Sequence, residues 1–367
     1  MLNSEQLRAV SIIDGPLLIL AGAGSGKTHT LTERVYSMIT DVWIAPTSIL
    51  CVTFTNKAAR EMRERVAKKL GRDMPMSFGI PRDFPLVSTF HSMWVMFLRL
   101  FIDKIGYARN FSIYDEDDVR SVIKEIIEGK RIDPKDAPPR QVQYEISLAK
   151  NNGLSPDKYG MSAESHFQWI VAEIYPDYEK KMRANNALDF DDILLKTRDV
   201  LHIPSVLEYF QDRFQYFCVD EYQDTNSIQY EIIQLLANKS KNLCVVGDDW
   251  QGIYSWRGAN IANILNFKHD LPAAEVVKLE QNYRSSSTII NAANVVIKNN
   301  QSALDKRMWT EAEEGEKIQI HECTSEREEA DKIGNFVEKN PASWAILYRT
   351  NGQSRVKEEA LIRRGVP

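Results

Sequence analysis

The sequence has few cysteines, no long apolar run and no basic leader, and each absence excludes a class of protein. Its 367 residues include four cysteines, none in a Cys-x-x-Cys pair, so the common zinc and iron–sulfur spacings do not occur. No run approaches the roughly 18 apolar residues that a membrane span needs. No basic stretch precedes an apolar one at the N-terminus, as a signal peptide would require. We therefore expect a cytoplasmic protein with reduced thiols and no membrane contact.

The composition is that of a globular chain with more than one domain. Hydrophobic residues at 43% and aromatic residues at 10% can fill real cores, which excludes wholesale disorder. At roughly 100–200 residues per domain, the length predicts two or three domains. The net charge of -5 gives no global sign of nucleic-acid binding, but it leaves room for a local basic patch.

Short apolar runs recur along the chain, and each ends in a polar or glycine-rich turn that a helical pattern follows. Such runs predict strands buried on both faces, and hence a parallel α/β sheet. The four runs are Leu17–Ala21, Ile49–Phe54, Tyr216–Val219 and Leu243–Val246. A charged stretch with helical periodicity, from about Tyr114 to Ala187, predicts a helical insertion within the first domain.

A second α/β unit is expected to begin after Lys278. Helical periodicity predicts a helix at Ser287–Asn299, and a further helix at Glu358–Arg364. Two apolar runs, Ile318–His321 and Trp344–Tyr348, predict strands of this second unit.

A phosphate-binding loop follows the first predicted strand and opens a predicted helix at Thr30–Ile39. The loop fits G-x-x-x-x-G-K-[ST], except that alanine replaces the first glycine. Glycines let successive backbone N–H groups point at phosphate oxygens, and the helix N-terminus adds a positive dipole end. Lys27 would reach the β- and γ-phosphates, and the Thr28 hydroxyl would ligate Mg²⁺. The residues of the loop are Ala21, Gly22, Ala23, Gly24, Ser25, Gly26, Lys27 and Thr28.

An acidic pair is expected on a strand neighbouring that of the phosphate loop. Asp220 and Glu221 close the run Tyr216–Val219, where Asp220 can hold Mg²⁺ and Glu221 can orient and deprotonate the attacking water. An Asp-Glu pair alone often merely starts a helix, but the apolar strand before it favours the functional interpretation. The guanine-reading sequence Asn-Lys-x-Asp is absent, so we expect ATP and not GTP.

A series of motifs stands in order along the whole chain: Gln6, Ala21–Thr28, Thr53–Ala59, Thr89–His91, Asp220–Asp224, Val246–Asp249, Gln251, Ile253–Gly258 and Gln281–Ser285. These motifs resemble those of the UvrD/Rep/PcrA helicases of superfamily I. The resemblance implies a RecA-like ATP-binding domain (1A) at residues 1–112 and 188–278, a helical insertion (1B) at 113–187, and part of a second RecA-like domain (2A) at 279–367. It also implies an ATP-driven translocase on single-stranded DNA that unwinds duplex in the 3′ to 5′ direction.

The resemblance also implies roles around the nucleotide. Gln6 would read the adenine, Arg34 would contact the nucleotide, and Tyr283 would stack on the base. Arg284 would reach the γ-phosphate as an arginine finger, and Gln251 would sense that phosphate and link it to the DNA side. A helix-cap role for Gln6 and a packed core position for Tyr283 stay open. Trp250 and Gly252 differ from the acidic and small hydroxyl residues of many members, so we expect an altered contact there, not a lost activity.

Aromatic and polar residues at two strand ends are candidates for the DNA-binding surface. Aromatic platforms hold single strands without reading sequence, because every base has a π face. A core position for the two aromatics near residue 255, a solvated helix after residue 56 and a satisfied histidine are the alternatives. The candidates are Phe54, Thr55, Asn56, His91, Tyr254, Trp256 and Arg257. The acidic residues at 189–192 are explained by capping of the next helix, and we assign them no catalysis.

The sequence ends at Pro367, before the inserted subdomain and the last two motifs of the family, including a second arginine that would face the γ-phosphate. We therefore expect this chain to bind ATP and single-stranded DNA or strand junctions as a monomer, and to fail at productive unwinding. DNA repair or replication, with DNA-repair proteins as partners, is the expected context. A binding module without turnover is the alternative. A small-substrate kinase ranks last, because it leaves Glu221, Gln251 and the two aromatics unexplained.

Overall fold

The computed structural model describes residues 2–74, 79–300, 304–340 and 342–366, except for the side chain of Arg257. It divides into two compact units, residues 1–314 and 315–367. No helix of the described residues is long and apolar enough to cross a membrane.

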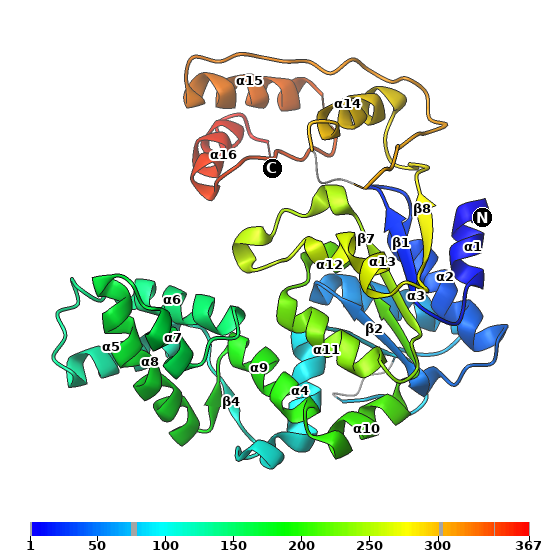
Figure 1. The fold of residues 1–367 in the computed structure, drawn as a ribbon. Coiled ribbons are helices and arrows are strands. Elements are labelled where there is room, and N and C mark those ends of the chain that lie inside the picture. Colours follow the sequence, from blue (N-terminus) through cyan, green and yellow to red (C-terminus); the bar gives the residue numbers. More distant parts are fainter. Residues whose placement is uncertain (1, 75–78, 301–303, 341, 367) are drawn as a thin grey trace. The chain divides into compact units, whose positions relative to one another are not determined.

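A sheet of six parallel strands, in the order β3-β2-β6-β7-β1-β8, forms the centre of the first unit (Figure 1). All four apolar runs form strands, so the prediction of a parallel α/β sheet is confirmed. The two edge strands β3 and β8 were not predicted. The strands are β1 (Leu17–Ala21), β2 (Ile49–Thr53), β3 (Leu86–Thr89), β6 (Tyr216–Val219), β7 (Leu243–Gly247) and β8 (Glu275–Leu279).

Alternate side chains of these strands enter two separate cores, because successive residues of a strand point to opposite faces. One face packs against α1 (Ser4–Ser11), α2 (Lys27–Thr40) and α3 (Asn56–Leu70), and it buries the thiols of Cys51, Cys218 and Cys244 as expected.

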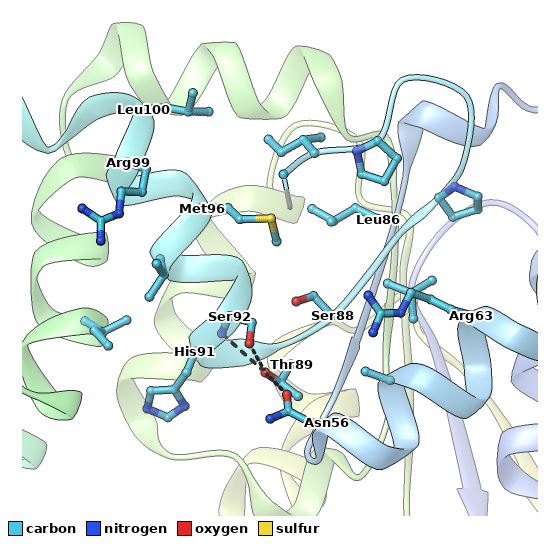
Figure 2. A pocket seen from close by; sticks show the side chains of 18 of the residues that line it. Asn56, Arg63, Leu86, Ser88, Thr89, His91, Ser92, Met96, Arg99 and Leu100 are labelled. Atoms are coloured by element: carbon cyan, nitrogen blue, oxygen red, sulfur yellow. Dashed lines mark hydrogen bonds between the residues drawn. The ribbon is translucent and has the colours of Figure 1, made fainter. Parts of the chain in front are cut away.

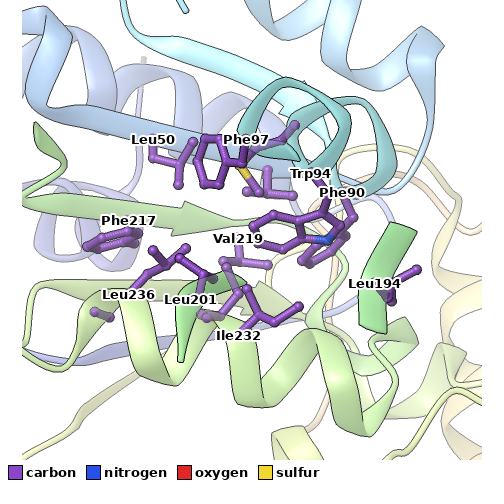
Figure 3. Close-up of a cluster of buried hydrophobic side chains, with 14 of the residues drawn as sticks. Leu50, Phe90, Trp94, Phe97, Leu194, Leu201, Phe217, Val219, Ile232 and Leu236 are labelled. Carbon is purple, nitrogen blue, oxygen red and sulfur yellow. The ribbon is translucent and has the colours of Figure 1, made fainter. Parts of the chain in front are cut away.

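The opposite face is covered by helices that come later in the chain. Figure 3 shows Trp94 and Phe97 of α4 with Val219 of β6 and Ile232 of α11, all at most 1% exposed. The helices of this side are α4 (Phe90–Phe101), α9 (Phe190–Leu201), α10 (Pro204–Arg213), α11 (Ser227–Ala237), α12 (Ala262–Leu265) and α13 (Phe267–Asp270). Because helices cover both faces of the sheet, the loops that follow the strands lie at the two ends of the strands.

The predicted helical insertion is confirmed and has its own apolar core. A short parallel pair, β4 (Ser112–Ile113) with β5 (Ala187–Leu188), brings its two ends together. Its helices are α5 (Glu116–Gly129), α6 (Pro139–Asn151), α7 (Pro156–Ser162) and α8 (His166–Ala184).

A buried lysine ties the insertion to α9. Asp189 caps α9 as predicted, by accepting from the Asp192 N–H at 2.7 Å. Both carboxylates also bind the ammonium of Lys150, at 2.7 and 2.8 Å, and Glu179 binds it at 2.8 Å. Burial opposes the charge of Lys150, but these three carboxylates outweigh it and raise its pKa well above the usual range. The capping interpretation therefore omitted this ion cluster.

After β8 the chain continues in the first unit as α14 (Ser287–Ile297), close to the predicted helix. The second unit contains α15 (Glu326–Lys339) and α16 (Ser354–Ile362), which pack against each other. The strands predicted at residues 318–321 and 344–348 were wrong, because neither run pairs with a strand among the described residues. Ile320 and Leu347 are 92% and 93% exposed, so these apolar side chains enter no core of this unit.

Candidate active site and nucleic-acid interface

The phosphate loop connects β1 to α2 and needs its glycines. Gly24 and Gly26 have φ of 68° and 83°, a region that residues with a Cβ rarely adopt. A Cβ at Gly24 would also lie 2.6 Å from the Asn282 side chain. Ala21 differs, because it is the last residue of β1 and lies in extended backbone, where glycine is not required. The departure from the motif at its first position therefore leaves the loop intact.

Gln6 lies directly beside this loop. Its amide Nε2 donates to the carbonyl of Ser25 at 2.9 Å, and its Oε1 accepts from the backbone N–H of Asn3 at 3.0 Å. Asn3 in turn donates to the hydroxyl of Tyr283 at 2.8 Å. Gln6 is thus part of a helix cap, and the same cap brings Tyr283 to the phosphate loop. Tyr283 is 55% exposed, so the alternative of a packed core aromatic is wrong.

Arg34 is buried on α2 and makes its contacts to backbone. Its guanidinium donates to the carbonyls of Ala9 at 3.0 Å and Ile13 at 3.0 Å, and to that of Ile12. These bonds hold the segment between α1 and β1. A contact of Arg34 with the nucleotide stays a prediction.

The acidic pair at the end of β6 reaches the phosphate loop although the two strands are not neighbours. β7 lies between β1 and β6, so the prediction that the acidic pair follows a strand next to that of the phosphate loop was wrong. The strands are parallel, so their carboxyl ends lie along the same edge of the sheet. The Lys27 Nζ therefore still lies 3.2 Å from Oε2 of Glu221. Glu221 has φ of 50°, a strained left-handed conformation. This backbone places the Glu221 carboxylate against Lys27.

Asp220 offers an oxygen ligand at the same edge. It is 3% exposed, and burial, with a smaller effect of Glu221, raises its pKa to about 7. Among the described residues no group of three or more His, Cys, Asp or Glu forms a metal cluster. Mg²⁺ does not require one, because it keeps waters and phosphate oxygens beside one or two protein ligands. The Asp220 carboxylate and the Thr28 hydroxyl are oxygen donors of the kind that Mg²⁺ takes.

Hydrogen bonds connect Glu221 to Gln251 through two further side chains. Gln223 donates to Oε2 of Glu221 at 2.8 Å, and its Oε1 accepts from the backbone N–H of Asp248 at 2.9 Å. The Asp248 carboxylate then accepts from the Gln251 amide. Sequence reasoning placed Gln251 near this edge but missed Gln223, although its amide stands two residues after Glu221.

Residues 282–284 lie on the phosphate loop. Asn282 donates to the carbonyl of Ala23 at 2.6 Å, and the backbone N–H of Tyr283 donates to that of Gly24 at 2.9 Å. The backbone N–H of Arg284 donates to Oδ1 of Asn282 at 2.8 Å. The predicted finger residue therefore starts beside the loop that would hold the phosphates.

Three aromatic rings follow one another from the end of β2 to the turn Ser255–Arg257. Phe54 stacks on Tyr254 with centroids 5.4 Å apart, and Tyr254 lies 6.4 Å from Trp256. Trp256 is 69% exposed, so its alternative as a core residue is wrong. The side chain of Arg257 lies outside the described part of the chain. Phe54 and Tyr254 are half-buried beside the exposed Trp256, and a row of rings of this kind is suited to stacking on bases.

A cavity of about 1030 Å³ adjoins the other predicted DNA residues (Figure 2). Thr89 caps α4 and donates to Asn56 at 3.4 Å, and Thr55 caps α3. His91 lies 5.9 Å from the ring of Phe190, edge to face, and burial lowers the His91 pKa. The cavity is also lined by Arg63, Arg82, Arg99 and Arg213.

Phe190 was missed by sequence reasoning. It is 52% exposed at the first position of α9 and lines this cavity. The signal was an aromatic residue in an otherwise acidic helix start, which the capping interpretation did not use. Guanidinium groups with an exposed ring suit a strand of phosphates and bases.

Residues 2–272 match the UvrD/REP helicase N-terminal domain, and residues 277–367 match the UvrD-like helicase C-terminal domain. The chain belongs to the UvrD/REP helicase family, which confirms the resemblance of its motifs. It is similar to the ATP-dependent DNA helicase PcrA of Staphylococcus aureus strain Mu50, with 47% identity over 373 residues that cover 100% of this chain and 50% of that protein. The PcrA of Staphylococcus epidermidis strain RP62A is 46% identical over the same shares. The chain thus spans about half the length of these curated relatives.

Proposed function

We propose that this chain carries the coupled ATP and single-stranded DNA sites of an ATP-dependent 3′–5′ DNA helicase. One observation carries the proposal. The hydrogen-bonded path from Lys27 through Glu221 and Asp248 ends at Gln251, three residues before Tyr254 of the aromatic platform. A kinase acting on a small substrate needs no such path.

Each residue of the site has its own role in ATP hydrolysis. Lys27 donates to the β- and γ-phosphates, and because an ammonium has three N–H donors it can keep Glu221 at the same time. Glu221 accepts the proton of the attacking water. Thr28 and Asp220 hold Mg²⁺, which when bound neutralises charge on the phosphate oxygens. Arg284 supplies a further positive charge to the γ-phosphate.

The nucleotide base is assigned to a small set of residues beside the loop. Gln6 reads the adenine edge, and the exposed ring of Tyr283 stacks on it. The contact between Asn3 and the Tyr283 hydroxyl supports this pairing, because it keeps both side chains at one end of the loop. Arg34 contacts the nucleotide in this proposal, in addition to the buried bonds by which it fixes the chain preceding β1.

Single-stranded DNA is assigned to the rings and polar groups at the ends of β2, β3 and β7. Phe54, Tyr254 and Trp256 stack on bases, and the arginines of the cavity neutralise phosphates. Thr55, Asn56, His91 and Arg257 add contacts to the strand, and we add Phe190 to this set. Residues 1–112 with 188–278, 113–187 and 279–367 are proposed as the domains 1A, 1B and part of 2A.

The proposed setting is a cytoplasmic monomer that acts at strand junctions in DNA repair or replication, with DNA-repair proteins as partners. The alternative is a module that binds nucleotide and single strands without turnover. Gln251 favours the enzyme, because its hydrogen bond to Asp248 connects it with the proposed base.

Equilibrium binding to this chain tests the proposal. We expect a fluorescent oligothymidylate to bind at low salt, and its affinity to change when Mg·ATPγS is added. A duplex without a tail is the control for the DNA, and Lys27→Ala is the control for the nucleotide. An unchanged DNA affinity over a saturating range of Mg·ATPγS would contradict the coupling of the two sites.

A further inference from the structure

A lysine that the proposed mechanism does not use is buried against residues 248–250, directly before Gln251 in the chain. The Lys306 Nζ lies 2.6 Å from Oδ1 of Asp248 and 2.9 Å from Oδ1 of Asp249, and the side chain is 0% exposed. It also lies 4.4 Å from the centroid of the Trp250 ring, as a cation–π contact.

The second oxygen of each carboxylate is also bound. Oδ2 of Asp249 accepts from the backbone N–H of Leu304 at 2.6 Å, and Oδ2 of Asp248 accepts from the Gln251 amide. Oδ1 of Asp248, which binds Lys306, also accepts from the backbone N–H of Trp250 at 3.1 Å. Two carboxylates and one ammonium leave a net charge of about −1, which buried N–H donors stabilise. Asp248 therefore binds Lys306 and Gln251 through its carboxylate, and Gln223 through its backbone N–H.

The segment that carries Lys306 also touches the phosphate loop. Met308 packs on Gly22 so closely that a Cβ there would lie 2.0 Å from its sulfur. Trp309 exchanges backbone hydrogen bonds with the segment that follows β8, donating to Glu280 at 3.0 Å and accepting from Asn282 at 2.7 Å. A shift of the loop at Gly22 would therefore displace Met308, and with it Lys306 two residues away.

These contacts form a closed circuit around the site. One arm runs from Lys27 through Glu221 and Gln223 to Asp248. The other runs from Gly22 through Met308 to Lys306 and returns to Asp248. Gln251 is bound where the two arms join.

We infer that Lys306 is a positioning residue that fixes Asp248 and Gln251 relative to the phosphate loop. Through it, binding of a phosphate in the loop changes the position of Gln251 and of the segment 304–309. The inference rests on the proposed function for the identity of the phosphate ligand. It extends that function, because it places the coupling partly in a residue outside the motifs.

Two variants separate positioning from simple stabilisation. Lys306→Met keeps the apolar stem but leaves two buried carboxylates without a cation, and this variant can fail to fold. Adding Asp249→Asn restores the net charge of about −1 and is expected to recover the stability. Lys357→Met is the matched control, since Lys357 has a side chain that is 6% exposed and pairs with Glu329 in the second unit.

Steady-state hydrolysis gives the first measurement. We expect Lys306→Met/Asp249→Asn to keep its KM for ATP within about 3-fold while stimulation by single-stranded DNA falls about 10-fold or more. Lys357→Met is expected to keep the stimulation of the unaltered chain. Unchanged stimulation in the double variant would mean that Lys306 serves stability alone, and it would overturn the inference.

Hydrogen–deuterium exchange tests the role of Lys306 without requiring turnover. A failure of this inference can therefore be told apart from a failure of the proposed function. In the unaltered chain, Mg·ATPγS is expected to slow exchange in the phosphate loop, at residues 246–251 and at residues 304–310. In the double variant the response of the loop is expected to persist and that of 304–310 to disappear. A persisting response at 304–310, or none there in the unaltered chain, would overturn the role of Lys306. Absence of hydrolysis together with the expected exchange pattern would count against the enzyme alone.

Discussion

The ammonium nitrogen of Lys27 lies 3.2 Å from a carboxylate oxygen of Glu221, although 194 positions separate them in the chain. The contact exists because β1 and β6 end at the same edge of a parallel sheet, and because Glu221 adopts φ of 50° directly after β6. Residues in such strained conformations cluster at functional sites. This pair defines the point from which the hydrogen bonds to Gln251 start.

Replacing Glu221 by glutamine is expected to abolish hydrolysis while ATP binding is kept. The amide cannot accept the proton of water, and a general base contributes about 10²- to 10⁴-fold in rate. Turnover and the affinity for a fluorescent ATP analogue are measured on the same preparation. Glu208→Gln, at an exposed position of α10, is the control. Equal turnover in Glu221→Gln and the control would remove Glu221 as the base.

Trp256→Ala is expected to weaken single-strand binding about 5- to 150-fold, which corresponds to about 1–3 kcal/mol for a stacked base. The nucleotide affinity should stay the same, because Trp256 lies beside Tyr254 in the turn Ser255–Arg257 and is not part of the phosphate loop. Fluorescence anisotropy with oligothymidylate measures the effect. Trp43→Ala removes a ring that is 85% exposed at the opposite edge of the sheet, and DNA affinity should not change. Similar losses in both variants would refute the platform.

Lys150→Met is expected to lower the free energy of unfolding by about 3–5 kcal/mol, because it leaves buried carboxylates without their cation. Urea unfolding followed by circular dichroism measures the change. Lys158→Met, at an exposed position of α7, should have almost no effect. A loss below about 1 kcal/mol in Lys150→Met would mean that the carboxylates take up protons or water at little cost.

His91 predicts a pH dependence of stability. Burial lowers its folded-state pKa below the ordinary 6.5, so the unfolded chain binds the proton more readily. Above 6.5 both states are neutral and no penalty exists; as the pH falls below 6.5, stability is lost until the folded-state pKa is passed. His91→Gln should flatten this part of the profile of unfolding free energy, and His166→Gln, at an exposed position, should not. An equal slope with and without His91 would contradict the burial argument.

The first sheet could be predicted from the sequence because strands buried on both faces leave continuous apolar runs. β3 and β8 were missed, because they are edge strands whose apolar runs are interrupted by polar residues such as Ser88 and Lys278. The runs at 318–321 and 344–348 show the opposite error, since apolar strand-like residues form no strand where no partner pairs with them.

The phosphate loop and the acidic pair were predictable, because their chemistry fixes residue types at fixed spacing. The roles of three other residues could not be predicted, because an amide, a ring and a lysine acquire a role only from what packs beside them. These residues are Gln223, Phe190 and Lys306. Lys306 is an example: its partners Asp248 and Asp249 are 58 and 57 positions away. A single sequence contains no pattern that joins such positions.

Hydrolysis of ATP by this chain at low salt, with and without single-stranded DNA, tests the central claim most directly. Low salt matters, because contacts to the DNA backbone weaken steeply as ions are added. Lys27→Ala serves as the blank. The account predicts turnover above the blank and a clear stimulation by DNA, which means that the path from Lys27 to Gln251 couples the two sites. Bound ATP without turnover in either condition would contradict it and leave a nucleotide-binding module.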